Sequence, residues 1–283
     1  MNAEVLYNGP LGLLAIPKNK EAAQALGTGT KWCTSAKDNN MFDHYNTIGP
    51  LYIWKDKSGD KFQFWINLRA GQEYEEVEYE EDEHYEFEDN EYEDEECYQI
   101  MDARDVPITP QQLKRFKTHP VLSKIIKQVE AAVLRNATST LLYARDVIKG
   151  RWKEGEKIIL KNPDDAMHYA RDVIKGRWKE GEKIIMTNPS DAKSYAIHII
   201  KGRWPEAEDV IAQSGNAAMR YAALVIKGRW RKAEPYIMKS PSAYQYALHV
   251  IKGRWPEAEP YIMKNPHQSK LYKNFLETLD EET

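Results

Sequence analysis

The sequence predicts an α+β domain followed by an all-α solenoid of 26-residue helix-hairpin repeats. Three observations lead to this prediction: strand-like segments with turn residues near the N-terminus, a tandem motif through the second half, and a change in the sign of the charge between the two. The expected parts are residues 1–108 for the α+β domain with an acidic insertion at about 68–97, residues 109–142 for a helical joint and N-terminal cap, residues 143–265 for five repeats, and residues 266–283 for a C-terminal capping helix.

Short strands and helices are expected in the first domain. Residues 4–16 predict two strands about an Asn-Gly turn, and residues 19–27, NKEAAQALG, predict a helix that Gly27 ends. A Gly-Thr-rich loop leads into a second helix within residues 27–46, and residues 49–69 predict a hairpin that turns at KSGD. The segment GTGTK superficially resembles a phosphate-binding loop, but it lacks the Walker spacing.

A tandem motif defines the second half of the chain. YARDVIKGRW begins at Tyr143 and again at Tyr169, followed by YAIHIIKGRW at Tyr195, YAALVIKGRW at Tyr221 and YALHVIKGRW at Tyr246. The spacings are 26, 26, 26 and 25 residues, which suits one pair of short helices per repeat. Such a pair cannot enclose a core alone, so stacked repeats are expected to bury Tyr, Ala, Val, Ile and Trp, at roughly 1.5–3 kcal/mol for each large apolar side chain.

Each repeat is expected to contain a helix A and a helix B. Ala144, Val147 and Ile148 follow the spacing of an apolar helix face, and Gly150 is expected to supply the left-handed residue that reverses the chain. Helix B begins after Trp152. Prolines at a first helical position mark further helix starts, namely Pro163, Pro189, Pro241 and Pro266 for helix A and the last helix, and Pro205 and Pro256 for helix B.

Helices of a different pattern flank the repeats. Thr109 is expected to cap a helix whose first residue is Pro110, and HPVLSKIIKQVEAAVLRN predicts a longer amphipathic helix; together they form the joint to the first domain. Tyr272 keeps the phase of the repeats, but the segment after it lacks GRW and ends in polar residues. This segment therefore predicts a capping helix.

Each A-to-B turn is expected to bring a lysine and an arginine to one basic edge. These residues are Lys149, Lys175, Lys201, Lys227 and Lys252, with Arg151, Arg177, Arg203, Arg229 and Arg254. Such an edge could follow the phosphates of a nucleic acid. The structural alternative is that each lysine caps helix carbonyls and each arginine pairs with a helix B glutamate: Glu156, Glu182, Glu208, Glu234 or Glu259. The tryptophans are expected to pack between repeats rather than to stack on bases.

The two positions after each Tyr-Ala differ between repeats. They are Arg145-Asp146, Arg171-Asp172, Ile197-His198, Ala223-Leu224 and Leu248-His249. If this side of helix A is exposed, the later repeats present an apolar patch with two histidines, which suits a partner or self-association into a homo-oligomer. Burial against neighbouring helices is the alternative. His198 and His249 have no carboxylate or cysteine at ligand spacing, so no metal site is expected.

Cys33 has the most reactive context in the first domain. It lies near the start of a predicted helix, whose dipole can lower a thiol pKa and favour a thiolate nucleophile. A catalytic set would comprise Cys33, His44 and Asp102, although no spacing motif supports it. The alternatives are a buried structural cysteine and a small binding pocket lined by Thr34, Ser35 and Tyr45.

Residues 73–96, EYEEVEYEEDEHYEFEDNEYEDEE, contain sixteen Asp or Glu among twenty-four residues. The pattern of the first domain resumes after them, so they form an insertion rather than a tail. Repelling charges favour a disordered loop, whereas the alternating aromatic residues would allow a hairpin with an anionic face. Such a face could imitate DNA phosphates, solubilise the protein or pair with the basic edge. Its glutamates would be Glu76, Glu78, Glu80, Glu86 and Glu88.

The net charge of −4 conceals a division along the chain. Residues 1–108 carry 9 Lys or Arg and 24 Asp or Glu, whereas residues 109–283 carry 31 and 20. This asymmetry favours attraction between domains or oppositely charged partners. No apolar run approaches the roughly 18 residues of a membrane span, and no signal peptide is evident, so a soluble, cytoplasmic protein is expected. Cys33 and Cys97 form no CxxC pair, so neither a disulfide framework nor a zinc site or cofactor is expected.

Three segments, GTGTKWCTSAKDNNMFDHYNTIGPLYIW, KFQFW and QIMDARDVPI, resemble the amino-terminal domain of uncharacterised proteins from tailed phages and related mobile elements. Some of those proteins carry tandem KGRWPEAEPYIMK repeats. The resemblance covers most of the chain and implies a viral accessory protein in the host cytoplasm, with no site residues to carry over. In the family a histidine often stands near the position of Trp65. Only a few residues there separate the strand that matches KFQFW from a segment QFMD, which corresponds to QIMD in this chain. This chain departs at both points, which weakens a Cys-His mechanism and makes residues 68–97 an insertion.

The leading expectation is a noncatalytic interaction protein with a role in host takeover or anti-defence. It would bind a host or viral macromolecule, with a protein as the leading partner, through the solenoid, the acidic insertion or both. Two alternatives stay open. One is a thiol-dependent transferase or hydrolase that uses Cys33, and the other is nucleic-acid binding by the basic edge.

Overall fold

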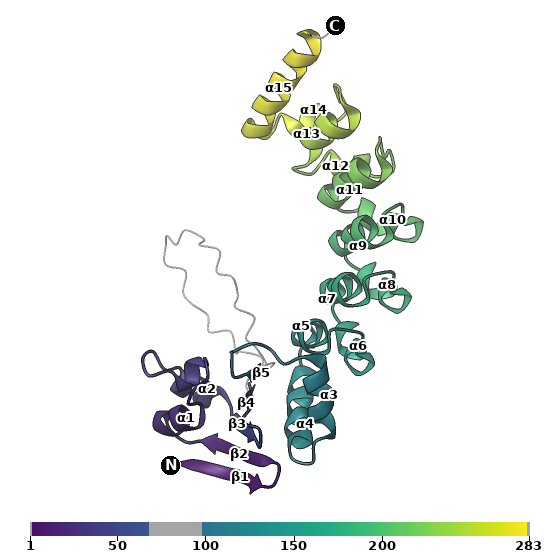
Figure 1. The fold of residues 1–283 in the computed structure, drawn as a ribbon. Coiled ribbons are helices and arrows are strands. Elements are labelled where there is room, and N and C mark those ends of the chain that lie inside the picture. Colours follow the sequence, from purple (N-terminus) through teal and green to yellow (C-terminus); the bar gives the residue numbers. More distant parts are fainter. Residues whose placement is uncertain (1, 68–97, 282–283) are drawn as a thin grey trace, which may run out of the picture. The chain divides into compact units, whose positions relative to one another are not determined.

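The computed structural model describes residues 2–67 and 98–281, and the chain separates into two compact units, Met1–Ile158 and Ile159–Thr283. Unit 1 holds a sheet, the helices that follow it and most of the first repeat, and unit 2 holds the other repeats (Figure 1). The prediction of an α+β N-terminal part followed by a helical part is confirmed. The acidic insertion, with Cys97 and the five glutamates singled out above, lies outside the described residues.

A five-stranded antiparallel sheet forms the centre of unit 1. Its strands lie in chain order and are β1 (Ala3–Gly9), β2 (Gly12–Pro17), β3 (Leu51–Asp56), β4 (Lys61–Ile66) and β5 (Tyr98–Asp102). The N-terminal hairpin is confirmed, but its strands pair as far as Gly9 and Gly12. Pro10 and Leu11 therefore form the turn, two residues beyond the predicted Asn8-Gly9. The second predicted hairpin is confirmed between β3 and β4.

Helices cover both faces of this sheet. On one face, Leu26 of α1 (Lys20–Leu26) and Phe42 of α2 (Phe42–Ile48) join clusters with side chains of β3. On the other face, Phe62 and Phe64 of β4 contact Phe116 of α3 (Pro110–Thr118), and α4 (Leu122–Val133) also contacts β4. Because successive side chains of a strand point to opposite faces, β3 and β4 are buried on both sides, and their sequences are nearly continuous apolar runs.

The helical joint begins as predicted. The Thr109 hydroxyl accepts the backbone N–H of Gln112, and the Gln112 side chain accepts the backbone N–H of Thr109. This reciprocal capping box satisfies two N–H groups at the start of α3, where Pro110 is the first helical residue. The joint belongs to unit 1 because α3 and α4 pack on the sheet.

Helix A of each repeat changes its hydrogen-bond pattern along its length. An α-helical segment runs directly into a π-helical segment, which has the wider i→i+5 pattern. The pairs are α5 (Ala137–Leu142) with η2 (Tyr143–Ile148), α7 (Pro163–His168) with η3 (Tyr169–Ile174), α9 (Pro189–Tyr195) with η4 (Ala196–Ile200), α11 (Gly215–Tyr221) with η6 (Ala222–Ile226), and α13 (Ala243–Tyr246) with η7 (Ala247–Ile251). The π-helical segment recurs at the same place, so it is a property of the repeat.

The turn after helix A corrects one prediction. The left-handed residue is the lysine and not the glycine that follows it: Lys149 has a φ of 54°, and its counterparts Lys175, Lys201, Lys227 and Lys252 have φ values of 58°, 57°, 58° and 56°. The N–H groups of Lys149 and Gly150 both bond to the carbonyl of Ala144. The π-helical pattern thus places the lysine at the residue that must turn left-handed to bring the next N–H to that carbonyl.

Helix B is shorter and less regular than helix A. Its segments are α6 (Lys153–Ile159), α8 (Lys179–Ile185), α10 (Glu208–Ala212) after the 3₁₀ turn η5 (Pro205–Ala207), α12 (Glu234–Ile237) and α14 (Glu259–Ile262). The helix starts at Pro163, Pro189, Pro205 and Pro266 are confirmed. Pro241 and Pro256 instead stand in turns before α13 and α14, because the later repeats open with irregular turns. The predicted last helix is α15 (Pro266–Glu281).

Consecutive repeats of unit 2 contact each other through helix A, from α7 to α9, α11, α13 and then α15 (Figure 1). Within each repeat the rings of the first tyrosine and of the tryptophan lie 5.0 to 5.1 Å apart. All five of these tryptophans are buried. Their ring contacts lie within a repeat, so the predicted packing between repeats stays a prediction. Among the helices that the structure describes, none is both long enough and apolar enough to cross a membrane.

Candidate functional site

A hydrogen-bonded network links neighbouring repeats of unit 2. The Arg177 guanidinium donates two hydrogen bonds to the Glu182 carboxylate, at 2.8 and 3.0 Å. Tyr195 of the next repeat donates its hydroxyl to Glu182 at 3.2 Å and accepts the backbone N–H of Trp178 at 2.7 Å. The tyrosine hydroxyl therefore satisfies an otherwise orphaned N–H just before helix B of the preceding repeat.

The same network recurs through the rest of unit 2. Its members are Arg203, Glu208, Tyr221 and Trp204, then Arg229, Glu234, Tyr246 and Trp230, and finally Arg254, Glu259, Tyr272 and Trp255. In unit 1, Arg151 likewise donates to Glu156. The predicted pairing of every arginine with a helix B glutamate is confirmed. The arginine half of the basic edge thus has its charge neutralised within the repeats.

Unit 1 contains a variant of this network. The Tyr143 hydroxyl donates to Glu130 of α4 at 3.1 Å, and the Lys117 ammonium lies 2.6 Å from the same carboxylate. Glu130 and Lys117 take the places that a helix B glutamate and its arginine have in the later repeats. The hairpin of α3 and α4 therefore gives the first tyrosine the acceptor that helix B gives to the others.

The network also shifts the pKa values of its members. Burial, together with a smaller effect of the nearby glutamates, raises the pKa of Tyr195, Tyr221 and Tyr246 to about 12. Hydrogen bonds from Arg203 hold the pKa of the Glu208 carboxyl below its usual value. Near neutral pH the tyrosines are therefore neutral and Glu208 is charged, which is the state that these hydrogen bonds need.

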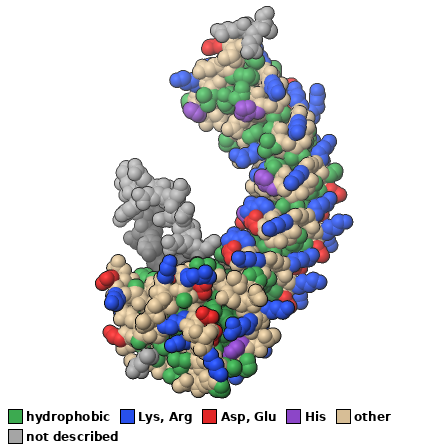
Figure 2. Space-filling view, in the orientation of Figure 1, with side chains coloured by type: hydrophobic (Ala, Val, Ile, Leu, Met, Phe, Trp, Pro, Cys, Tyr) green, Lys and Arg blue, Asp and Glu red, His purple; other side chains and the backbone are tan. Residues whose placement is uncertain are grey.

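The lysines of the basic edge differ from the arginines. All five side chains, those of Lys149, Lys175, Lys201, Lys227 and Lys252, are exposed, and none makes an ion pair with the described residues. Their backbone N–H groups, rather than their ammonium groups, bond helix carbonyls. Lys and Arg side chains project along the repeats in Figure 2. Of the predicted basic edge, the lysine charges are therefore not neutralised by residues 2–67 or 98–281.

Six residues that follow the repeat tyrosines form what we term the variable strip: Ile197, His198, Ala223, Leu224, Leu248 and His249. His198, Leu224 and His249 are exposed, and the other three are partly exposed. Leu224 is 57% exposed, the most of the described large apolar residues in unit 2. The π-helical segments η4, η6 and η7 that carry the strip contact one another in turn. Exposure of this side of helix A, one of the two expectations, is confirmed.

The equivalent positions in the first two repeats are ionic. Arg171 donates two hydrogen bonds to Asp172, and its guanidinium also lies 2.5 Å from His168 Nδ1. In unit 1, Arg145 pairs with Asp146 at 2.8 Å. These positions are therefore ionic in the first two repeats and mainly apolar from the third, although the tyrosine and tryptophan packing stays the same.

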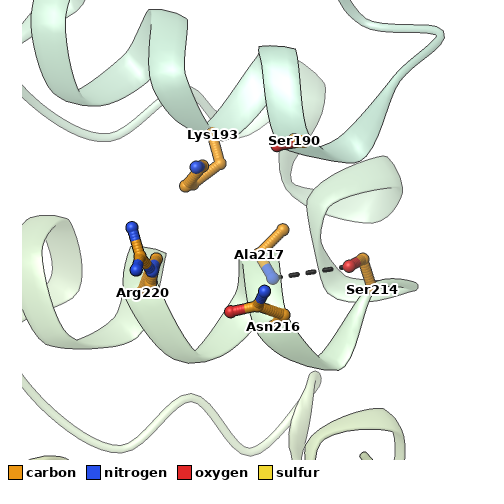
Figure 3. A pocket seen from close by; sticks show the side chains of 6 residues that line it. All are labelled: Ser190, Lys193, Ser214, Asn216, Ala217 and Arg220. Atoms are coloured by element: carbon orange, nitrogen blue, oxygen red, sulfur yellow. Dashed lines mark hydrogen bonds between the residues drawn. The ribbon is translucent and has the colours of Figure 1, made fainter. Parts of the chain in front are cut away.

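An open cavity of about 310 Å³ lies between repeats 3 and 4 (Figure 3). It is lined by Ser190 and Lys193 of α9, by Asn216, Ala217 and Arg220 of α11, and by Ser214 just before α11. The Ser214 hydroxyl caps α11 by accepting the Ala217 N–H. The sequence patterns considered above did not single out this cavity, because its two cations stand in different repeats at positions outside the GRW motif.

The surroundings of Cys33 do not favour a reactive thiolate. Cys33 begins η1 (Cys33–Ser35), a 3₁₀ turn of three residues. Burial raises the pKa of its thiol, and the charge of Asp105 raises it further, against a smaller opposing effect from a hydrogen bond with Tyr45. The expectation of a lowered pKa is wrong because one short turn has little dipole to set against desolvation.

The other members of the predicted catalytic set have structural contacts. The His44 ring is exposed and packs edge-on against Tyr45, with ring centroids 5.5 Å apart. The Asp102 carboxylate accepts the Arg104 guanidinium at 2.6 and 2.9 Å. Within residues 2–67 and 98–281, no hydrogen bond joins Cys33 to His44 or Asp102. A catalytic role for these three residues stays a prediction to which their contacts add nothing.

The predicted pocket residues of the first domain are also engaged. Thr34 is buried and donates its hydroxyl to Gln63 at 2.5 Å, and the Ser35 hydroxyl lies 2.9 Å from that of Thr30. Among the described residues there is no group of three or more His, Cys, Asp or Glu side chains that could hold a metal ion.

Comparisons with known proteins found no matching family model, no matching curated protein and no matching solved structure.

Proposed function

We propose that this chain is a noncatalytic binding protein whose repeats form a solenoid and present the variable strip to a macromolecular partner. The observation that carries the proposal is the exposure of the strip on neighbouring π-helical segments, with Leu224 57% exposed. Soluble proteins seldom leave contiguous apolar side chains uncovered unless a partner covers them. In the proposed arrangement, residues 109–142 and 266–283 cap the repeats of residues 143–265, which follow the domain of residues 1–108 in the chain.

The contrast between framework and strip supports binding over a purely structural role. Arginine, glutamate, tyrosine and tryptophan repeat their contacts from one hairpin to the next, whereas the strip changes from ionic to apolar. Repeat proteins keep a constant framework and recognise partners through the exposed positions of one face. The strip has that character.

The chemistry of the strip favours a protein as the partner. The centres of protein interfaces are rich in apolar and aromatic side chains and poor in charged ones. Ile197, Leu224 and Leu248 supply apolar contacts, and the strip contains no Lys, Arg, Asp or Glu. The resemblance to phage proteins points to a host or viral protein, and hence to a role in host takeover or anti-defence.

The test compares capture of host and viral proteins by the tagged chain and by a Leu224→Glu, Leu248→Glu double variant. The double variant should capture at least about tenfold less of one partner that binds the unaltered chain stoichiometrically, because charges would replace apolar contacts. Leu271→Glu is the matched control, because Leu271 is 36% exposed and lies outside the strip. No stoichiometric partner for the unaltered chain, or equal capture by all three proteins, would reject the proposal.

A second candidate, nucleic-acid binding, is favoured by the five exposed lysines, which make no ion pair within the described part of the chain. Binding through phosphates should weaken steeply with added salt. Changing Lys175, Lys201 and Lys227 to Glu together should abolish a mobility shift with RNA or DNA at low salt. The matched control changes Lys179, Lys183 and Lys239 to Glu, which alters the net charge by the same amount. These three lysines are exposed and lie outside the basic edge. Equal losses in the two variants, or no shift at low salt, would rule this candidate out.

A further inference from the structure

The cavity between repeats 3 and 4 departs from the pattern of the other repeats. Lys193 stands two residues before the tyrosine of repeat 3, where repeats 2 and 4 have Met167 and Met219. Arg220 stands one residue before the tyrosine of repeat 4, where repeats 2 and 3 have His168 and Ser194. The framework therefore does not require a cation at either position, yet here two cations line one cavity (Figure 3).

The described residues do not neutralise these two cations. Neither Lys193 nor Arg220 makes an ion pair or a side-chain hydrogen bond with them. Burial lowers the pKa of Lys193 and the charge of Arg220 lowers it further, while Asp191 acts in the opposite direction. The two like charges at this cavity repel each other, and an anion bound between them would relieve that repulsion.

The rest of the lining suits the oxygens of a phosphate. Ser190 and Asn216 add a hydroxyl and an amide, both of which can donate hydrogen bonds. Ammonium and guanidinium groups are the two side-chain cations that bind phosphate most often. A volume of about 310 Å³ lies at the lower end of small-molecule sites, so a compact ligand fits it.

We propose that this cavity binds the phosphate group of a small phosphorylated molecule, with Lys193 and Arg220 as its cations and Ser190 and Asn216 as neutral donors. A phosphate monoester carries nearly two negative charges near neutral pH, which matches the two cations. The cavity lies on the α-helical segments before the tyrosines, whereas the variable strip follows them. The inference is therefore independent of the proposed function.

The experiment measures binding to the full chain by calorimetry and by thermal shift at constant ionic strength. The probes are inorganic phosphate, adenosine 5′-monophosphate and glucose 6-phosphate, with adenosine and glucose as their uncharged counterparts. Both phosphate esters should bind and raise the melting temperature, because a ligand of the folded state stabilises it, whereas adenosine and glucose should have no effect. The affinity for inorganic phosphate shows whether the natural ligand is free phosphate or a phosphate ester. If inorganic phosphate binds as tightly as the esters, the site is one for free phosphate, and if it binds more weakly, the site is one for an ester.

Two variants replace the cations with residues from equivalent positions in neighbouring repeats. Lys193→Met and Arg220→Ser should fold, because Met219 and Ser194 already occupy these positions. Each should weaken binding of the phosphorylated probes at least about tenfold. Lys270→Met is the matched control: Lys270 also stands two residues before a repeat tyrosine, but it is exposed and Leu271 follows it.

Three results would overturn the inference. The first is that no phosphorylated probe binds the unaltered chain at millimolar concentration. The second is that Lys193→Met and Arg220→Ser bind as tightly as the unaltered chain. The third is that Lys270→Met loses as much affinity as they do. Circular dichroism and the melting temperature without ligand verify the fold of each variant.

Discussion

Lys201 holds a left-handed backbone conformation at the end of helix A, with a φ of 57°, and the next residue is a glycine without a positive φ. A non-glycine residue in this conformation costs roughly 1–2 kcal/mol. The cost recurs at every turn, because the carbonyl of Ala196 accepts both the Lys201 and Gly202 N–H groups. The motif KGRW therefore places its glycine one residue after the strained position.

Substitutions of Lys201 and Gly202 test which of the two residues carries the backbone strain. Lys201→Gly should stabilise the chain by up to about 1 kcal/mol. Glycine relieves the strain of the left-handed conformation, but its greater conformational freedom in the unfolded chain offsets part of this gain. Gly202→Ala should be neutral or stabilising by up to about 1 kcal/mol, since an added Cβ meets nothing within 4 Å. Urea unfolding midpoints check both. A loss of 1 kcal/mol or more in Gly202→Ala would place the left-handed residue at the glycine instead.

Asp191 should make stability depend on pH. Burial and, to a smaller extent, the charge of Asp164 raise its pKa to about 6, against the opposing charges of His168 and Lys193. Between its unfolded value near 3.8 and its folded value, the folded chain keeps a proton that the unfolded chain releases. The stability from this group is therefore fully present below pH 3.8 and falls as the pH rises through 6.

Asp191→Asn tests this dependence. At pH 7 to 8 the variant should be more stable than the unaltered chain, by on the order of 1–3 kcal/mol, and the difference should vanish near pH 4. The measurement is the difference between the melting temperatures of the two proteins at each pH, which removes contributions common to both. Asp209→Asn, at an acid whose side chain is 73% exposed, should leave the profile unchanged. A constant difference between Asp191→Asn and the unaltered chain would contradict the assignment.

The junction between helix B of one repeat and helix A of the next depends on a tyrosine hydroxyl. Tyr221 accepts the Trp204 N–H at 2.7 Å and donates to Glu208 at 3.1 Å, and both of these contacts are buried. Arg203 completes the network from the surface, with a side chain that is 58% exposed. A buried N–H left without a partner costs about 1–3 kcal/mol. The Arg203–Glu208 ion pair is part-buried but its arginine side chain is mostly exposed, so we expect it to contribute less, below about 1 kcal/mol.

Loss of the tyrosine hydroxyl should therefore lower the free energy of unfolding more than loss of the arginine. Tyr221→Phe should lower the free energy of unfolding by about 1–3 kcal/mol, because it removes the acceptor of the Trp204 N–H. Arg203→Gln should lower it by less than about 1 kcal/mol. Denaturant unfolding measures both, and hydrogen exchange at the Trp204 amide should quicken only in Tyr221→Phe. The opposite ranking would mean that the surface ion pair, and not the hydroxyl, holds the junction.

At the scale of the whole molecule, the stability of each repeat should depend on contact with its neighbours. Tyr272 of α15 is fully buried and accepts the Trp255 N–H at 2.8 Å, so removing residues 266–283 exposes the last repeat. In a stacked array each repeat depends on its nearest neighbours. Hydrogen exchange should then speed up most in repeat 5, less in repeat 4, and not at all in the sheet of unit 1. Uniform loss of protection along the chain would contradict this.

Most of the fold could be predicted from local patterns. The hairpins of the sheet, the caps at Asn162 and Asn188 and the restart of helix A every 26 residues follow from neighbouring residues. The π-helical segments could not be predicted, because their apolar spacing fits an α-helix equally well. The cavity was missed because Lys193 and Arg220 lie 27 residues apart and meet only when α9 packs on α11.

By itself, the sequence determined the repeat length, most of the helix starts and the order of sheet and helices, and it offered the pairing of each arginine with a glutamate as one of two alternatives. Each of these follows from residues within a few turns of one another, where caps, prolines and periodicity act. Only the tertiary structure decided which charges stay unpaired, which apolar side chains of helix A are exposed and whether the Cys33 thiol is activated. Those properties depend on desolvation and on partners from separate helices, and packing alone brings these together.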